Sequence, residues 1–114
     1  MIHPSADVSA DAVVGDRTRV WDQARVRERV VIGTDCIIGR GAYLDADVTI
    51  GDRVKIQNNA LVYHGVTVEA GVFIGPAAVL TNDRFPRAIT VEGQLSGADD
   101  WSVSEIRLRE GCSV

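Results

Sequence analysis

A six-residue spacing of aliphatic residues constrains this chain more than any other feature. Every sixth residue is Val, Ile or Leu, although these types make up only 31 of the 114 residues. The 14 positions of this first series are Ile2, Val8, Val14, Val20, Val26, Ile32, Ile38, Leu44, Ile50, Ile56, Val62, Val68, Ile74 and Leu80. A period of six does not fit the 3.6-residue turn of an α-helix, so the pattern argues against helices.

A second series lies four residues after each member of the first, and all its members are small or β-branched. They are Ala6, Ala12, Thr18, Ala24, Val30, Cys36, Ala42, Val48, Val54, Ala60, Val66, Val72 and Ala78. Turn-forming residues crowd the positions between the series, as in Gly15-Asp16 and Gly51-Asp52. The pattern predicts a short strand and a sharp corner, repeated three times per 18-residue coil. Successive coils would stack at the strand spacing of about 4.8 Å.

This pattern resembles the hexapeptide-repeat family over residues 2 to about 85. The resemblance implies an all-β fold, a left-handed parallel β-helix of about five 18-residue coils. We expect residues 1–114 to form a single domain of this kind. The handedness follows from the family, as does the expectation of a homotrimer with sites between subunits.

The repeat stops after Leu80. Arg84 occupies the next small position, and no six-residue pattern survives from Asn82 to about Arg107. We expect an extruded loop over residues 82–107, since unpatterned stretches this long are usually functional or disordered. The pattern resumes in a shifted register at Leu108, with Cys112 four residues later.

The sequence ends at Val114 without a recognisable cap for the solenoid. Acyltransferases of the family usually continue with further coils, which contribute to holding coenzyme A. Two expectations stay open: C-terminal coils are missing from this chain, or a partner covers its end.

Residues 18 apart should lie on one face, one coil above the other. His64 and Asn82 have this spacing, so their Cα atoms should be about 5 Å apart along the prism axis. Tyr63 and Thr81 form the neighbouring column, and Asp83 lies beside Asn82. The polar stretch around His64 and the start of the loop therefore converge on one surface.

Several short motifs narrow the resemblance. They are Lys55-Ile56-Gln57-Asn58-Asn59, Val62-Tyr63-His64-Gly65-Val66, Gly75-Pro76, Thr81-Asn82-Asp83 and Pro86-Arg87-Ala88. Together they are similar to the subgroup that N-acetylates amino sugars on nucleotide carriers, for surface polysaccharides and glycosylated products. Relatives often have an acidic residue where this chain has His64. The Pro-Arg-Ala segment resembles one that helps form a site between subunits.

The resemblance implies acetyl-CoA as acyl donor and a nucleotide-linked amino sugar as acceptor. His64 would take the amine proton or orient the amine, since histidine can accept a proton near neutral pH. Asn82 would hold the amine or the thioester carbonyl.

The remaining candidates would bind substrate. Asn58, Asn59 and Tyr63 are expected at the sugar, Arg87 at a phosphate, and Asp83 is a further substrate contact. Alternatives without a function stay open. In these, Asn58 and Asn59 only form turns, Arg87 is a solvent-exposed charge, and His64 is an exposed corner residue.

The bulk composition excludes several other functions. A net charge of −4 argues against a nucleic-acid surface. No apolar run reaches the roughly 20 residues of a membrane span. Cys36 and Cys112 form no paired motif, which favours a reduced, cytoplasmic setting. His3 and His64 are too far apart to share a metal, so no metal site is expected. The competing interpretation is a non-catalytic scaffold for oligomerisation, or a truncated and inactive acyltransferase.

Overall fold

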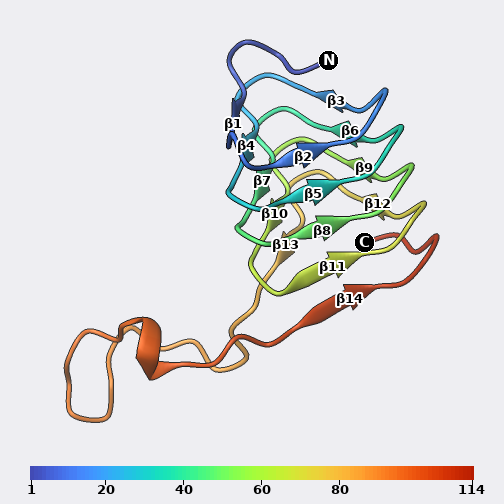
Figure 1. The fold of residues 1–114 in the computed structure, drawn as a ribbon. Coiled ribbons are helices and arrows are strands. Elements are labelled where there is room, and N and C mark those ends of the chain that lie inside the picture. Colours follow the sequence, from blue (N-terminus) through green and yellow to red (C-terminus); the bar gives the residue numbers. More distant parts are fainter.

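A computed structural model describes all of residues 1–114 as a triangular prism of stacked short strands with one projecting loop (Figure 1). All strand pairs of the prism are parallel. The one helical segment is the 3-10 turn η1 (Ala98–Asp100) in the loop. No helix has the length and apolar character needed to cross a membrane.

The strands form three sheets, one on each face of the prism. The first sheet contains, in spatial order, β1 (Asp7–Val8), β4 (Arg25–Val26), β7 (Tyr43–Leu44), β10 (Leu61–Val62) and β13 (Val79–Leu80). The second contains β2 (Val13–Val14), β5 (Val31–Ile32), β8 (Thr49–Ile50), β11 (Val66–Val68) and β14 (Ile106–Leu108). The third contains β3 (Arg19–Val20), β6 (Ile37–Ile38), β9 (Lys55–Ile56) and β12 (Phe73–Ile74).

The register of the sheets confirms the 18-residue coil. Val26 pairs with Leu44, and Leu44 pairs with Val62, each 18 residues along the chain. The fold is therefore the expected parallel β-helix. Two sheets have five strands and one has four, so the coils number between four and five, close to the expected five. The left hand of the helix stays an expectation from the family resemblance.

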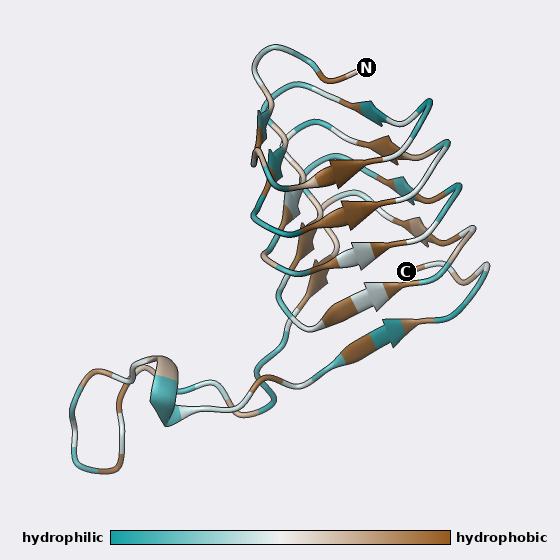
Figure 2. Ribbon diagram, in the orientation of Figure 1, coloured by the Kyte–Doolittle hydropathy of each residue, from teal (hydrophilic) through white to brown (hydrophobic).

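Both residue series line the inside of the prism, as predicted, except for Ile2, which is 47% exposed at the N-terminal end. The core contains 20 buried hydrophobic residues, and all of them belong to the two series. Their strands alternate with polar corners, which the hydropathy colouring makes visible (Figure 2). Thr18 is the only polar member of this core. Its hydroxyl donates to the carbonyl of Gly33 at 2.7 Å and accepts from the N–H of Cys36 at 3.1 Å, which offsets its burial.

From Arg17 to Ala77, each corner of the prism bends through one residue of positive φ, at six-residue spacing. Asn59 has φ 61° and Asp47 has φ 66°, as the sequence suggested. Arg17, Arg29 and Arg53 hold the same place with φ between 54° and 60°, which turn propensity did not predict. The Arg17 and Arg29 side chains also form ion pairs with the next coil along the chain, with Asp35 at 2.8 Å and with Asp47 at 2.7 Å.

The long loop leaves the prism after β13 and projects well beyond it (Figure 1). Its base is closed by a hydrogen bond of 2.7 Å from the N–H of Ser104 to the carbonyl of Asn82. The loop ends earlier than the predicted boundary at residue 107, because β14 pairs with β11 from Ile106 onward. Leu108, where the sequence predicted that the repeat resumes, lies opposite Val68.

A carboxylate anchors the chain where it returns to the prism. Glu69 accepts a hydrogen bond from the N–H of Glu110 at 3.0 Å and from Arg107 at 3.2 Å. Arg109 lies 3.5 Å from the same carboxylate. The N–H of Glu110, followed by Arg107, holds the pKa of Glu69 below its ordinary value of 4.5. Glu69 thereby links the last coil to the coil before the loop.

We expect Glu69→Gln to be less stable than the wild type at neutral pH. Because the folded-state pKa of Glu69 is lowered, its contribution is present above about pH 4.5 and is lost as the pH falls through the folded-state value. The stability difference should therefore shrink below pH 4.5. Denaturant unfolding between pH 3 and 7 measures it, roughly spanning the carboxylate range. Glu92→Gln, in the exposed loop, is the control; equal curves for both variants would contradict the anchor.

Candidate functional site

The candidate site lies at the prism corner that joins the first sheet to the second. Tyr63, His64 and Gly65 form this corner between β10 and β11. The loop begins one coil further along the chain, at Thr81-Asn82-Asp83. The register of β10 and β13 stacks these two segments, as the 18-residue spacing predicted.

His64 is held by the preceding coil and by the following coil along the chain. Its Nδ1 lies 2.8 Å from the carbonyl oxygen of Ala46, and its backbone N–H donates to Asp45 at 2.9 Å. From above, the side-chain amide of Asn82 donates to the carbonyl of His64 at 3.0 Å. The imidazole is still 46% exposed, so solvent or a substrate can approach it. The predicted proximity of His64 and Asn82 is confirmed.

A charged cluster surrounds the imidazole on the side of the coil below. The carboxylate of Asp47 lies 3.7 Å from His64 Nδ1. Arg29 forms two hydrogen bonds with Asp47, at 2.7 and 3.3 Å, and holds the pKa of that carboxyl below its ordinary value. Asp47 therefore stays ionised near neutral pH and places a negative charge beside the ring.

A cavity of about 250 Å³ opens beside the histidine column. Its lining consists of Tyr63, Thr81, Asn82, Asp83 and Pro86. Three of the predicted substrate contacts or catalytic residues, Tyr63, Asn82 and Asp83, therefore share one cavity. The ring of Tyr63 leans on that of Tyr43, with centroids 5.9 Å apart and an angle of 57° between the planes.

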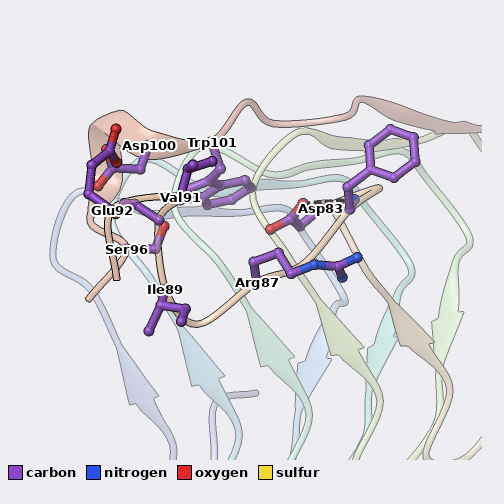
Figure 3. A pocket seen from close by; sticks show the side chains of 10 residues that line it. Asp83, Arg87, Ile89, Val91, Glu92, Ser96, Asp100 and Trp101 are labelled. Carbon is purple, nitrogen blue, oxygen red and sulfur yellow. Dashed lines mark hydrogen bonds between the residues drawn. The ribbon is translucent and has the colours of Figure 1, made fainter. Parts of the chain in front are cut away.

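A second cavity of about 320 Å³ lies in the loop itself, and Asp83 lines both cavities. Figure 3 shows Asp83 and Arg87 on one side of it and Glu92, Ser96 and Asp100 on the other, with Trp101 between them. The lining contains three carboxylates, Asp83, Glu92 and Asp100, and one guanidinium, that of Arg87. This balance suits a cation better than a phosphate.

Arg87 lines this loop cavity, but its guanidinium donates to the adjacent carbonyl of Pro86 at 2.8 Å. Within one protomer, it therefore lies among carboxylates and not in a basic phosphate site.

Asn58 and Asn59 lie at a different corner, between β9 and β10. Asn58 accepts a hydrogen bond from the N–H of Arg40 at 3.0 Å, and Asn59 has φ 61°. In one protomer both act as turn residues, and the structure does not bring them to His64.

Sequence reasoning missed the residues below the histidine, chiefly Asp45, Ala46 and Asp47. The same 18-residue step that pointed upward from His64 to Asn82 leads downward from His64 to Ala46. The sequence therefore contained the spacing that identifies Ala46 and its neighbours.

No group of three or more His, Cys, Asp or Glu side chains is arranged to hold a metal ion.

Most of the chain matches a known protein-family profile. The profile described as bacterial transferase hexapeptide (six repeats) matches residues 11–46 and 47–82, which together make up more than half of the chain. The chain belongs to this family. No curated protein matches the sequence of this chain.

Several solved structures are similar to it. One is a variant of perosamine N-acetyltransferase from Caulobacter crescentus with CoA and GDP-perosamine, 25% identical, TM-score 0.57, covering 84% of this chain and 55% of that one. PerB from the same organism, with the same two ligands, is 26% identical, TM-score 0.55, covering 84% and 56%. The acetyltransferase domain of PglB from Neisseria gonorrhoeae FA1090 is 28% identical, TM-score 0.55, covering 71% and 48%. The present hexapeptide protein spans about half the length of these neighbours.

Gly65 is needed where the returning loop crosses this corner. It has φ 93°, and a Cβ atom there would lie 2.7 Å from a methyl carbon of Val103. We expect Gly65→Ala to lower the free energy of unfolding by about 1–3 kcal/mol. Denaturant unfolding measures this, with Gly97→Ala as control, because a Cβ at Gly97 meets nothing closer than 3.6 Å. Equal stability of the two variants would contradict the crossing.

Proposed function

We propose that this hexapeptide protein is an acetyl-CoA-dependent N-acetyltransferase acting on the amino group of a nucleotide-linked amino sugar. The observation that carries the proposal is the arrangement at the His64 corner: the imidazole is fixed by the Ala46 carbonyl and exposed, and the His64 carbonyl is bound by Asn82, which lines the adjacent cavity. Its solved neighbours with CoA and GDP-perosamine support the choice of donor and acceptor.

The chain's own residues supply the proton transfers. His64 Nε2 accepts a proton from the acceptor amine as the amine nitrogen attacks the thioester carbonyl carbon. The C–S bond then breaks, and the imidazolium returns the proton to the departing thiolate. Asp47, 3.7 Å from Nδ1, stabilises the imidazolium between these two steps.

Asn82 is suited to the developing oxyanion. One N–H of its side-chain amide donates to the carbonyl of His64, and the second is free. A donor of this kind stabilises a tetrahedral intermediate.

Asp83 would receive the acceptor before reaction. Amino sugars are cationic near neutral pH, and Asp83 belongs to both cavities. A carboxylate at their junction attracts an ammonium group to the corner, where it releases one proton to solvent and then reacts as the neutral amine whose second proton His64 accepts.

The remaining predicted contacts need a second copy of the chain. Asn58, Asn59 and Arg87 do not join the His64 corner within one protomer, so we propose that they contact substrate between subunits of a homotrimer. We further propose a cytoplasmic setting, which the two free thiols, Cys36 and Cys112, favour.

We expect His64→Ala to lower kcat about 10²–10⁴-fold, the usual contribution of a general base. Asn82→Ala should lower kcat about 10²–10³-fold, as losses of oxyanion donors do. Thiol release from acetyl-CoA, with GDP-perosamine as the acceptor probe, measures both. A matched control is Gln57→Ala, at another corner. Wild-type rates in both site variants would contradict the site, and a lack of any turnover or acetyl-CoA binding would favour the scaffold.

We expect the purified chain to be trimeric at micromolar concentration. Several large apolar residues lie exposed on the outside, among them Val13 and Val31 on adjacent strands and Phe85 and Leu95 in the loop. Such residues are typical of subunit interfaces. Light scattering should give three times the chain mass of 12.3 kDa. A monomer would rule out a site that is shared between subunits.

A further inference from the structure

The hydrogen bond of the His64 ring determines which nitrogen carries the proton. Nδ1 lies 2.8 Å from the carbonyl oxygen of Ala46. A carbonyl oxygen can only accept, so Nδ1 must be the protonated nitrogen for this bond to exist. In the neutral ring, Nε2 is then unprotonated and free to accept a proton.

His3 provides the opposite case in the same chain. The backbone N–H of Ser5 donates to His3 Nδ1 at 3.1 Å. Nδ1 is therefore the acceptor there, and the neutral ring carries its hydrogen on Nε2. The two histidines of the chain are thus held in opposite tautomers.

Asp45 ties together the two backbone segments that fix the His64 ring. Its Oδ2 accepts from the N–H of His64 at 2.9 Å, and its Oδ1 accepts from the N–H of Ala46 at 2.9 Å. One carboxylate thereby holds both the histidine and the residue whose carbonyl receives the ring N–H.

Asp45 is itself firmly held. The Tyr43 hydroxyl donates to Oδ1 at 3.1 Å, and Arg27 lies 3.4 Å from the same oxygen. Only 17% of the side chain is exposed. Four donors on one nearly buried carboxylate leave it little freedom to turn away.

We propose that Asp45 is a positioning residue that fixes His64 in the Nδ1–H tautomer, so that Nε2 is available as the proton acceptor. The inference rests on the proposed transferase function for its catalytic consequence, although the tautomer can be measured without activity. The other ionised groups near the ring are Asp47, which lies 3.7 Å from Nδ1, and Arg29, which engages Asp47. Neither of them bonds the main chain of His64.

Two- and three-bond ¹H–¹⁵N correlation spectra of the full chain distinguish the tautomers of both histidines. We expect Nδ1–H for His64 and Nε2–H for His3 in the wild type. Asp45→Ala should abolish the single tautomer at His64 and leave His3 unchanged. In the acetyl-transfer assay above, its kcat should fall about 10–100-fold with little change in KM, the usual effect of a misplaced group.

Asp35→Ala is the matched control. Asp35 also pairs with an arginine one coil below, Arg17 at 2.8 Å, but lies at another corner. It should leave the His64 tautomer and kcat unchanged. If Asp45→Ala fails to fold, Asp45→Asn tests the same point. Its single amide oxygen can accept from only one of the two backbone N–H groups. We therefore expect a His64 spectrum intermediate between those of the wild type and a ring without a fixed tautomer.

Two results would overturn the inference. An Nε2–H tautomer at His64 in the wild type would refute it whatever the activity. An unaltered tautomer in both Asp45 variants would refute the role of Asp45. If the tautomer responds as expected but His64→Ala keeps full activity, the positioning holds and the failure belongs to the proposed base.

Discussion

Stacking of identical coils at an 18-residue register is the constraint on which the rest of this structure depends. Leu44 rests between Val26 and Val62, and the backbone of each coil bonds the next through parallel pairs. Because the core admits only one register, the corners must stack as well. Arg17 therefore meets Asp35, and Arg29 meets Asp47, without any separate requirement. Burial sets the register, and the surface charges follow it.

The same register builds the candidate site. Asp45, His64 and Asn82 come from three successive coils, yet each contacts the next through a backbone group. Side chains fixed to stacked backbones have little freedom, which is the preorganisation that proton transfer requires. The site needs no loop closure to align these three residues. The loop adds walls and charge around a corner that is already arranged.

The fold was predictable because one residue type at one spacing reports directly on burial. The pairing of His64 with Asn82 followed from the same arithmetic. The start of β14 was not predictable, since Val68 pairs with Leu108, 40 residues later, and no multiple of six gives that step. Nor could spacing reveal that Asn58 bonds the backbone of Arg40, or that the two oxygens of Asp45 divide between two N–H groups. Those outcomes depend on side-chain rotamers.

A regular prism of this kind has no interior room for a substrate, because aliphatic side chains fill it. Any site must lie on the outside, where polar side chains are allowed. A corner alone is convex, so a second segment beside it helps to form a cavity. The insertion after Leu80 provides that segment, and its first residues line the cavity beside Tyr63. Asp83 then belongs both to this cavity and to the one within the loop. Under the proposed function, this one carboxylate joins the rigid corner, where His64 would accept a proton, to the loop, where the remainder of the acceptor would lie.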